Sequence, residues 1–400
     1  MASAVWLAAL GAFICSLDSA LNVAFPAISS AFAVAPDRIA LLIVFYHVPI
    51  GILTVLGGLL GDRFGHRRVF ACGLWTTALS FPLCGLAPDY ALLLAGRAVQ
   101  GVGAGLVFGT APALVTLSLS RDRRAPGLGV LGVATGAGLA VAPLLAGLLI
   151  DAFGWRSVFF FRVPLALAAA LVVWRRPPRA VTPRPPARPE RMRDVPHVST
   201  RLVLRDVLAA AANCAFFSTY IFVPYYLVDV ARYSATAAGV IFTMLPLCTS
   251  LGSLAGGSLA GRFSAERLVV AGLGLETAGL CALTAVDVAS GALLVAVGLA
   301  LTGGGLGLFQ VPNTALVMAA LPDRSQGAAG GMITAMRTVG IVTAAFGGPR
   351  LFAAREAAHA ASGGPERFVA AFSDTFLVSA VLGAAGLALA VALWTTARHR

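Results

Sequence analysis

Long apolar runs separated by short polar segments make up most of this 400-residue sequence. A helix needs about 20 mostly apolar residues to cross a lipid bilayer, and twelve runs come close to that length. Because the runs are long and do not alternate between apolar and polar residues, we expect helices rather than strands. The expected spans are approximately residues 4–28, 39–60, 69–86, 92–118, 127–150, 158–174, 203–228, 237–260, 268–286, 291–320, 327–352 and 368–394. The pattern therefore predicts an all-α integral membrane protein.

The composition excludes most soluble proteins. Hydrophobic residues make up 58% of the chain and charged residues 12%, whereas soluble proteins carry about 25% charged residues. The 44 glycines are typical of membrane helices whose backbones approach closely. The six cysteines lie inside apolar runs without a C-x-x-C spacing, so we expect neither a metal site nor disulfides, and no cofactor.

The net charge of +12 comes from arginine alone, because the sequence has no lysine. Twenty of the 29 arginines fall on one side of the predicted spans and seven, with Arg162 among them, on the other; Arg97 and Arg337 lie inside spans. Cytoplasmic loops carry the excess of positive charge, so we expect both termini and the central linker in the cytoplasm. No nucleic-acid partner is expected, because the arginines do not alternate with aromatic residues. The alanine-rich, lysine-free composition indicates a bacterial inner-membrane protein.

A segment rich in proline and arginine divides the chain into two halves. We expect residues 1–174 to form an N-terminal six-helix bundle, residues 175–202 a basic cytoplasmic linker, and residues 203–400 a C-terminal six-helix bundle. The linker is too polar to bury a core and is expected to contact anionic membrane lipids. The halves share similar segments: residues 58–64 with 257–263, and residues 113–115 with 315–317. Duplicated helical halves with a site between them are typical of secondary transporters.

The loop after the second span reads GLLGDRFGHRR, residues 58–68. It resembles the signature loop of the major facilitator superfamily, G-x-L-a-D-[RK]-x-G-[RK]-[RK], with His66 where the family has a base. Gly58 and Gly65 permit a tight turn. We expect Asp62 to face a helix N-terminus or an arginine and so to form a conformational lock between the bundles. The residues of this expected lock are Gly58, Asp62, Arg63, Gly65 and Arg67.

Two segments resemble motifs of drug:proton antiporters within that superfamily. Residues 17–26, LDSALNVAFP, resemble the first-span motif, with Ala20 in place of threonine. Residues 138–147 resemble the antiporter motif G-x-x-x-G-P-x-x-G-G, with alanine replacing two glycines. The retained positions of this second motif include Gly138, Pro143 and Gly147.

Three more segments extend the resemblance over most of the chain. Residues 97–105 resemble the superfamily's R-x-x-Q-G-x-G motif, and residues 154–164 and 303–313 are similar to the fourteen-helix drug exporters. The additional helix pair of those exporters is missing. The resemblance therefore implies a twelve-helix major facilitator fold made of two pseudo-symmetric six-helix bundles.

Asp18 is the clearest candidate for function, because a carboxylate inside a membrane span is costly and usually functional. We expect Asp18 to be the proton-coupling acid and Arg97 to be its charge partner. The proton occupancy of such a group responds to solvent access and to substrate. The alternative is a static buried ion pair that only fixes helix packing.

Polar residues recur in every third span, as expected if equivalent helices line a central cavity. The resemblance also implies a cavity lined by those helices. Alternatives remain: His47 could be a packing histidine, Phe217 and Tyr220 could be interfacial or core residues, and Arg337 could meet an anionic substrate or Asp62. The candidate cavity residues are Asn22, His47, Gln100, Asn213, Phe217, Tyr220, Gln310, Asn313 and Arg337.

These features favour a monomeric secondary active transporter that exports drug-like or natural-product molecules in exchange for protons. The alternatives are a proton-coupled importer of a nutrient or metabolite and a lipid flippase of the same fold. An enzyme is not expected, because no H-E-x-x-H motif, Walker A lysine or in-span Ser/His/Asp set is present. The expected partners are small-molecule substrate, protons and membrane lipids.

Overall fold

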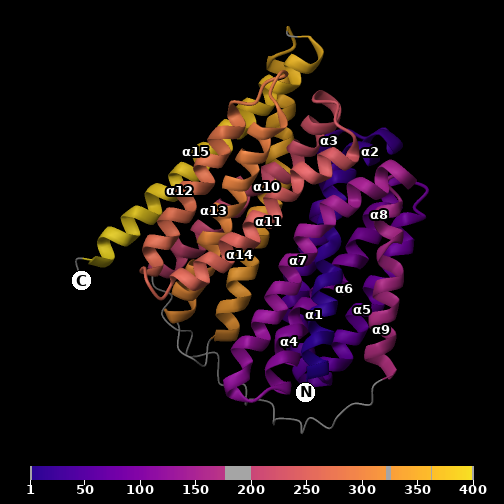
Figure 1. Ribbon diagram of the computed structural model, residues 1–400, viewed down its shortest axis with the longest axis vertical. Coiled ribbons are helices and arrows are strands. Elements are labelled where there is room, and N and C mark those ends of the chain that lie inside the picture. Colours follow the sequence, from indigo (N-terminus) through magenta and orange to yellow (C-terminus); the bar gives the residue numbers. More distant parts are fainter. Residues whose placement is uncertain (1, 176–199, 321–325, 362, 399–400) are drawn as a thin grey trace. The chain divides into compact units, whose positions relative to one another are not determined.

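The computed structural model describes residues 2–175, 200–320, 326–361 and 363–398 (Figure 1). Most of the expected linker, residues 175–202, therefore lies outside the described residues. All regular elements in the described ranges are helices. In chain order they are α1 (Ala2–Ser16), η1 (Leu17–Ser19), α2 (Ala20–Phe32), α3 (Pro36–Ile39), α4 (Leu41–Phe64), α5 (His66–Gly85), α6 (Tyr90–Ser118), α7 (Arg121–Phe153), α8 (Ser157–Phe160), α9 (Arg162–Arg175), α10 (Thr200–Tyr225), η2 (Tyr226–Val230), α11 (Ala235–Leu259), α12 (Ala265–Thr284), α13 (Ala292–Ala319), α14 (Gln326–Ala358) and α15 (Gly364–Arg398).

Joined end to end, these elements give the twelve helical segments that the sequence predicts. Ten of them are long and apolar enough to cross a membrane by length and composition, as judged on the described residues. The other two are α5, which begins with basic residues, and α14. Several helices extend beyond the apolar runs: α7 already begins at Arg121 and α14 continues to Ala358. The twelve predicted helices are therefore confirmed, ten of them as apolar helices of membrane-spanning length in the described residues, with ends shifted by a few residues.

Short polar loops start several helices through side-chain caps. The Asp89 carboxylate accepts a hydrogen bond from the Leu92 backbone N–H at 2.8 Å at the start of α6. Ser234 and Ser264 cap α11 and α12 in the same way. These bonds satisfy backbone donors that the first turn of a helix leaves free, which explains why the helices begin at these residues.

The described chain packs into two compact units. The first unit contains Met1–Asp18, Phe45–Gly138 and Arg156–Thr200. In it, α5 packs against α6 and α9, and α6 packs against α1 (Figure 1). Its core consists of buried aliphatic and aromatic side chains, among them Phe70 and Phe81.

The second unit contains Ser19–Val44, Leu139–Trp155 and Arg201–Arg400. In it, α13 packs against α11 and α12, while α15 packs against α12 and α14 (Figure 1). The short helix α3 contacts α14, and α2 contacts α11. These units cut the chain at points other than the ends of the linker, so the two-bundle domain boundaries remain a prediction.

The internal repeat is visible in matching helix contacts. In the first unit, a Cβ on Gly103 would meet the Thr77 backbone N at 2.7 Å, where α6 crosses α5. In the second unit, a Cβ on Gly305 would overlap the backbone of Glu276, where α13 crosses α12. Such close approach requires glycine. The same backbone contact therefore occurs at corresponding places in both halves, as the echoed sequence segments predict.

Candidate functional site

Asp18 lies where the first helical segment changes geometry. α1 ends at Ser16, the 3-10 turn η1 covers Leu17–Ser19, and α2 begins at Ala20. A short 3-10 stretch inside a helix often marks a functional hinge. The Asp18 side chain is buried, with 9% of the residue exposed. The expected proton-coupling residue therefore points into protein at a break in the helix.

The Asp18 carboxylate accepts four hydrogen bonds. Oδ1 accepts from Arg97 Nη1 at 2.6 Å, and Oδ2 accepts from Arg97 Nη2 at 2.8 Å. Gln100 Nε2 donates to Oδ1 at 2.8 Å, and Arg162 Nη1 donates to the same oxygen at 3.1 Å. Two parallel bonds from one guanidinium give a strong, directional ion pair. The structure thus brings together three residues that the sequence singled out: Asp18, Arg97 and Gln100.

Arg162 is the member of this cluster that the sequence analysis missed. We counted it among the loop arginines of one side, and that assignment is wrong: its side chain is fully buried. Besides its bond to Asp18, Arg162 donates through Nε to the Val158 carbonyl at 2.8 Å. Arg162 is near the start of the expected span 158–174, where we assigned its charge to the adjoining loop. Its contact with Asp18 joins residues that are far apart in the sequence, so its partner was not visible in the local pattern.

Aromatic rings surround the two guanidinium groups. The Arg97 guanidinium carbon lies 4.1 Å from the centre of the Tyr46 ring. The Arg162 guanidinium carbon lies 4.6 Å from the Phe81 ring and 5.4 Å from the Phe159 ring. Aromatic faces attract cations, more strongly where water is excluded. We call Asp18, Arg97, Gln100 and Arg162 the Asp18 cluster; its charged groups are two cations and one anion.

Two further candidate cavity residues, Asn22 and His47, lie on the first two helical segments but make none of the four hydrogen bonds that the Asp18 carboxylate accepts. Asn22 is buried and donates through Nδ2 to the Ser19 carbonyl at 3.1 Å. His47 is half-buried, with its ring 5.2 Å from and perpendicular to that of Tyr46. His47 thus neighbours the tyrosine that covers Arg97.

The candidates on α10, α13 and α14 belong to the second unit. Asn213 and Asn313 are buried and donate to the carbonyls of Ala209 and Arg205 at 2.8 Å and 3.4 Å. Gln310 is half-buried and Arg337 exposed. The cavity proposed for these residues remains a prediction.

Phe217 and Tyr220 form an aromatic group in α10. Their rings stack with centres 5.0 Å apart and an interplanar angle of 23°. Tyr220 also meets Phe242 of α11 edge to face, at 5.4 Å. Both residues are buried, with 9% and 8% of their surfaces exposed, so core packing accounts for their contacts in this structure.

The expected lock loop folds as a tight turn within the first unit. Gly65 has a φ of 93°, which favours glycine, and it precedes the first residue of α5. Asp62 is exposed and its Oδ1 lies 3.1 Å from His66 Nε2. Arg67 donates to the Val173 carbonyl of α9 at 2.6 Å, and Arg63 lies over the Phe64 ring. An ideal Cβ on Gly58 would lie 3.8 Å from the Gly109 carbonyl oxygen. The proposed inter-bundle role of this loop remains a prediction.

The antiporter-type motif runs along two different contacts of α7. A Cβ on Gly138 would meet the Phe13 carbonyl of α1 at 2.6 Å. A Cβ on Gly147 would meet Thr236 Cα of α11 at 2.8 Å, and the Pro143 carbonyl faces Gly239 of the same helix. The motif therefore provides glycines at two close helix crossings.

Asp151, which the sequence analysis did not single out, extends the contact between α7 and α11. Its carboxylate accepts backbone hydrogen bonds from Ala235 at 3.1 Å and Thr236 at 2.8 Å, at the start of α11. A carboxylate at a helix N-terminus interacts favourably with the helix dipole. The C-terminal end of α7 is thereby held against the start of α11 within the second unit.

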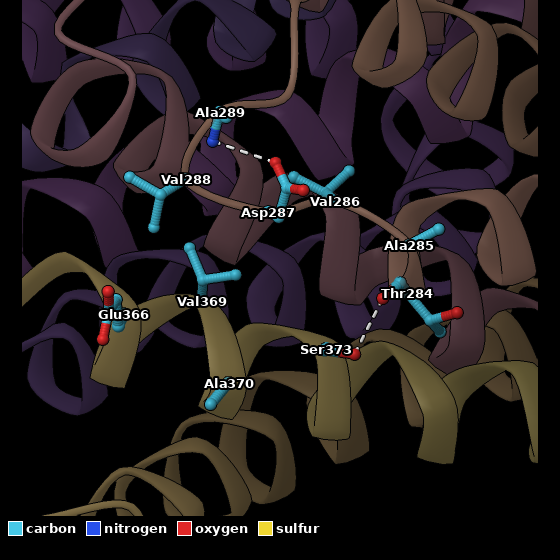
Figure 2. A pocket seen from close by; sticks show the side chains of 10 residues that line it. All are labelled: Thr284, Ala285, Val286, Asp287, Val288, Ala289, Glu366, Val369, Ala370 and Ser373. Atoms are coloured by element: carbon cyan, nitrogen blue, oxygen red, sulfur yellow. Dashed lines mark hydrogen bonds between the residues drawn. The ribbon is translucent and has the colours of Figure 1, made fainter. Parts of the chain in front are cut away.

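An open hollow of about 550 Å³ lies between the α12–α13 loop and the first turns of α15 (Figure 2). Ser373 donates to the Thr284 carbonyl at its edge, and the Ala289 backbone donates to Asp287 within the loop. None of the candidate cavity residues lines it. Its lining residues are Thr284, Ala285, Val286, Asp287, Val288, Ala289, Glu366, Val369, Ala370 and Ser373.

Curated proteins with similar sequences are transporters or resistance proteins. The chain is 29% identical to multidrug resistance protein Stp of Mycobacterium tuberculosis, over 83% of this chain and 72% of that protein. It is 23% identical to riboflavin transporter RibZ of Clostridioides difficile, over 82% and 83% of the two chains. It is 28% identical to puromycin resistance protein pur8 of Streptomyces alboniger, over 80% and 75%.

A solved structure shares the fold. A bacterial homologue of the human lysosomal transporter Spinster matches with a TM-score of 0.79 and 15% identity, covering 98% of this chain and 96% of that chain. The sequence profile described as Major Facilitator Superfamily matches residues 5–345. The chain therefore belongs to the Major Facilitator Superfamily and is a membrane transporter rather than an enzyme, as the sequence predicted.

Proposed function

We propose that this transporter exports drug-like or natural-product small molecules in exchange for protons, by alternating access. The observation that carries the proposal is the Asp18 cluster. A buried carboxylate at a break in the first helical segment is held by Arg97 and Arg162. Buried ionisable groups in membrane proteins commonly serve proton or substrate pathways.

Proton uptake by Asp18 would change the balance of charge in the cluster. Protonation removes the anion and leaves two guanidinium groups that both pointed at it. Like charges repel, and they repel more strongly at the low effective dielectric constant of a protein interior than in water. The protonated cluster is therefore unstable in the arrangement described above, and separation of the arginines lowers its energy. Movement at η1, the 3-10 turn that contains Asp18, would couple this separation to a change of conformation.

The names of the relatives bear on the substrate. Two of them are a multidrug resistance protein and a puromycin resistance protein, which supports export of antibiotic-like molecules. The relative named riboflavin transporter supports a second candidate function, proton-coupled import of a metabolite. A lipid flippase of the same fold is a further alternative.

The placement of the protein follows from its charge distribution. We propose a bacterial inner membrane location, with both termini and the basic linker in the cytoplasm, because arginines concentrate on that side. The linker would contact anionic lipids, and the transporter would work as a monomer.

Everted membrane vesicles test the proposal directly. When the vesicle interior is made acidic, an exporter accumulates substrate inside, and we expect this for puromycin. Asp18→Asn should reduce the accumulation to that of vesicles lacking the protein, while Asp37→Asn, which removes an exposed carboxylate on α3, should leave it unchanged. Accumulation of riboflavin in right-side-out vesicles under an external acid pulse would support the importer instead.

The amount of protein must be compared as well, because Asp18→Asn leaves two buried arginines without their counterion. The double variant Asp18→Asn/Arg162→Gln restores the net charge of the wild-type cluster and serves as the matched control. If either variant is present in normal amounts and transports puromycin with undiminished response to the proton gradient, the role of Asp18 is refuted.

A further inference from the structure

Glu276 lies near the middle of α12 and is buried inside the second unit. Only 1% of its surface is exposed. Both carboxylate oxygens lack a hydrogen-bond partner among the described residues. A buried polar group without a partner is destabilising relative to a satisfied one, and an isolated buried charge costs far more. Packing alone does not explain an acid here, because an apolar side chain would avoid this cost.

Among the residues whose side chains the structure describes, the helices packed on α12 bring no cation to Glu276. α13 has no ionisable side chain along its whole length. On α15, the position opposite this part of α12 is Gly383, whose ideal Cβ lies 2.9 Å from Thr277 Oγ1. The ionisable residues of α15 are Glu366, Arg367 and Asp374 toward its start, where the Asp374 carboxylate lies 2.9 Å from His359, and Arg398 at its last position. Those of α12 itself are Glu266 and Arg267 at its start and Cys281, which is exposed.

The electrostatic consequence is that Glu276 is held as a neutral acid while α12, α13 and α15 stay packed. Loss of its proton requires water or a cation to reach the side chain. α13 contacts the backbone of α12 at this residue, since a Cβ on Gly305 would overlap the Glu276 backbone and would lie 2.6 Å from the Gly272 carbonyl. A shift of α13 along α12 is therefore the movement that would expose the acid.

The internal repeat relates Glu276 to the Asp18 cluster. Glu276 faces Gly305 as Thr77 faces Gly103 in the first half. Thr77 lies one helical turn before Phe81, and the centre of the Phe81 ring lies 4.6 Å from the Arg162 guanidinium carbon. Glu276 thus occupies, in the second half, the helix face that borders the Asp18 cluster in the first.

The contact in the second half that corresponds to the Asp18–Arg162 ion pair is uncharged. In the first half, Asp18 and Arg162 join the first and sixth helical segments. In the second half, the corresponding segments α10 and α15 are joined by a buried hydrogen bond of 3.0 Å between Ser379 and Ser218. The second half therefore has a carboxyl group on the equivalent helix face without the arginines that hold Asp18.

We propose that Glu276 is a second proton-binding site of this transporter, neutral in the packed state and ionised when α12 and α13 separate. It would bind and release one proton per cycle in addition to Asp18. The inference rests on the proposed proton coupling for its role in transport, but the protonation of Glu276 is measurable independently of transport.

Infrared difference spectroscopy of the purified protein in lipid tests the protonation. The wild type should show a carbonyl stretch of a protonated carboxyl group without hydrogen bonds, and this band should change when puromycin is added. The band should be absent in Glu276→Gln, which keeps the shape of the side chain, and present in Glu366→Gln, which changes an exposed carboxyl. Identical spectra of wild type and Glu276→Gln, or a band that puromycin leaves unchanged, would overturn the proposal.

Proton counting in proteoliposomes tests the role in transport. Per molecule of puromycin moved, Glu276→Gln should exchange one proton fewer than the wild type, whereas Glu366→Gln should match the wild type. Equal proton counts for wild type and Glu276→Gln would reject the second site while leaving the proposed function intact. A wild type that moves puromycin without any proton flux would instead reject the proposed function.

Discussion

Asp18 is held by two arginines that differ in geometry. Arg97 makes two short bonds to the carboxylate and a third to Gln100 Oε1 at 2.7 Å. Arg162 makes one longer bond to the carboxylate, and its second terminal nitrogen lacks a hydrogen-bond partner among the described residues. Arg97 therefore neutralises Asp18, whereas Arg162 adds a second cation that Asp18 does not fully balance.

This difference predicts unequal effects of removing each arginine. Arg97→Met breaks the two-bond ion pair and should lower the free energy of unfolding by about 3–5 kcal/mol, as for other broken buried pairs. Arg162→Met removes one charged hydrogen bond together with the uncompensated charge, and should cost less, about 1–3 kcal/mol. Thermal unfolding of both variants in detergent measures the order. A loss for Arg162→Met equal to or larger than that for Arg97→Met would contradict the unequal roles.

At the residue scale, the sequence predicted the pair Asp18 and Arg97 because both charges interrupt apolar runs. Arg162 was missed because it stands near the start of the expected span 158–174, where we assigned its charge to the adjoining loop. Its burial depends on a partner that only the folded chain brings near. The sequence also carried no sign of the role of Asp151, because its partners are backbone N–H groups of another helix that only folding brings near.

At the scale of helices, glycine contacts determine how closely neighbours approach. Gly103 and Gly305 are at equivalent crossings of α6 with α5 and of α13 with α12. Gly274 of α12 is within one helical turn of the crossing with α13. It faces open space, since its ideal Cβ has no heavy atom within 4 Å. Substitution of Gly103 or Gly305 changes both helix packing and helix propensity, whereas substitution of Gly274 changes helix propensity alone.

Alanine substitutions should therefore have opposite signs at these sites. Gly305→Ala and Gly103→Ala insert a methyl group into a backbone contact and should each destabilise the protein by about 1–3 kcal/mol. Gly274→Ala meets no neighbour and should be neutral or stabilise by up to about 1 kcal/mol, because alanine favours a helix over glycine. The shift in melting temperature in detergent shows the sign. Destabilisation by Gly274→Ala as large as that by Gly305→Ala would contradict the contact argument.

The existence of the helices was predictable, and their irregularities were not. Twelve apolar runs define twelve segments because membrane thickness sets their length. The 3-10 turn Leu17–Ser19 and the π-helix Tyr226–Val230 each contain an aspartate, Asp18 and Asp229, but one acidic residue in an apolar run does not by itself predict a change of helix type. Such local changes depend on side-chain and backbone contacts with other helices, which periodicity does not encode.

At the scale of the whole molecule, the arginine distribution predicts one orientation in the membrane. Burial of Arg162 strengthens the prediction, because it removes one charge from the less positive side. The loop before α5 then lies in the cytoplasm and the loop before α6 outside. Two exposed residues, Arg68 and Pro88, report on these two loops.

Single cysteines at these positions test the orientation in a variant whose six native cysteines are replaced. Pro88→Cys should react with a membrane-impermeant maleimide in intact cells. Arg68→Cys should react only after the membrane is opened. The reverse pattern of labelling would place the termini on the opposite side and refute the predicted orientation.

The excess of guanidinium over carboxylate in the Asp18 cluster has a consequence for the choice of coupling ion. An alkali metal ion approaching Asp18 meets net repulsion and finds the carboxylate oxygens already accepting four hydrogen bonds. A proton needs only one lone pair and no coordination shell. We therefore expect the site to discriminate against sodium, and puromycin transport in vesicles should proceed at the same rate when choline replaces sodium. Stimulation by sodium would contradict this selectivity.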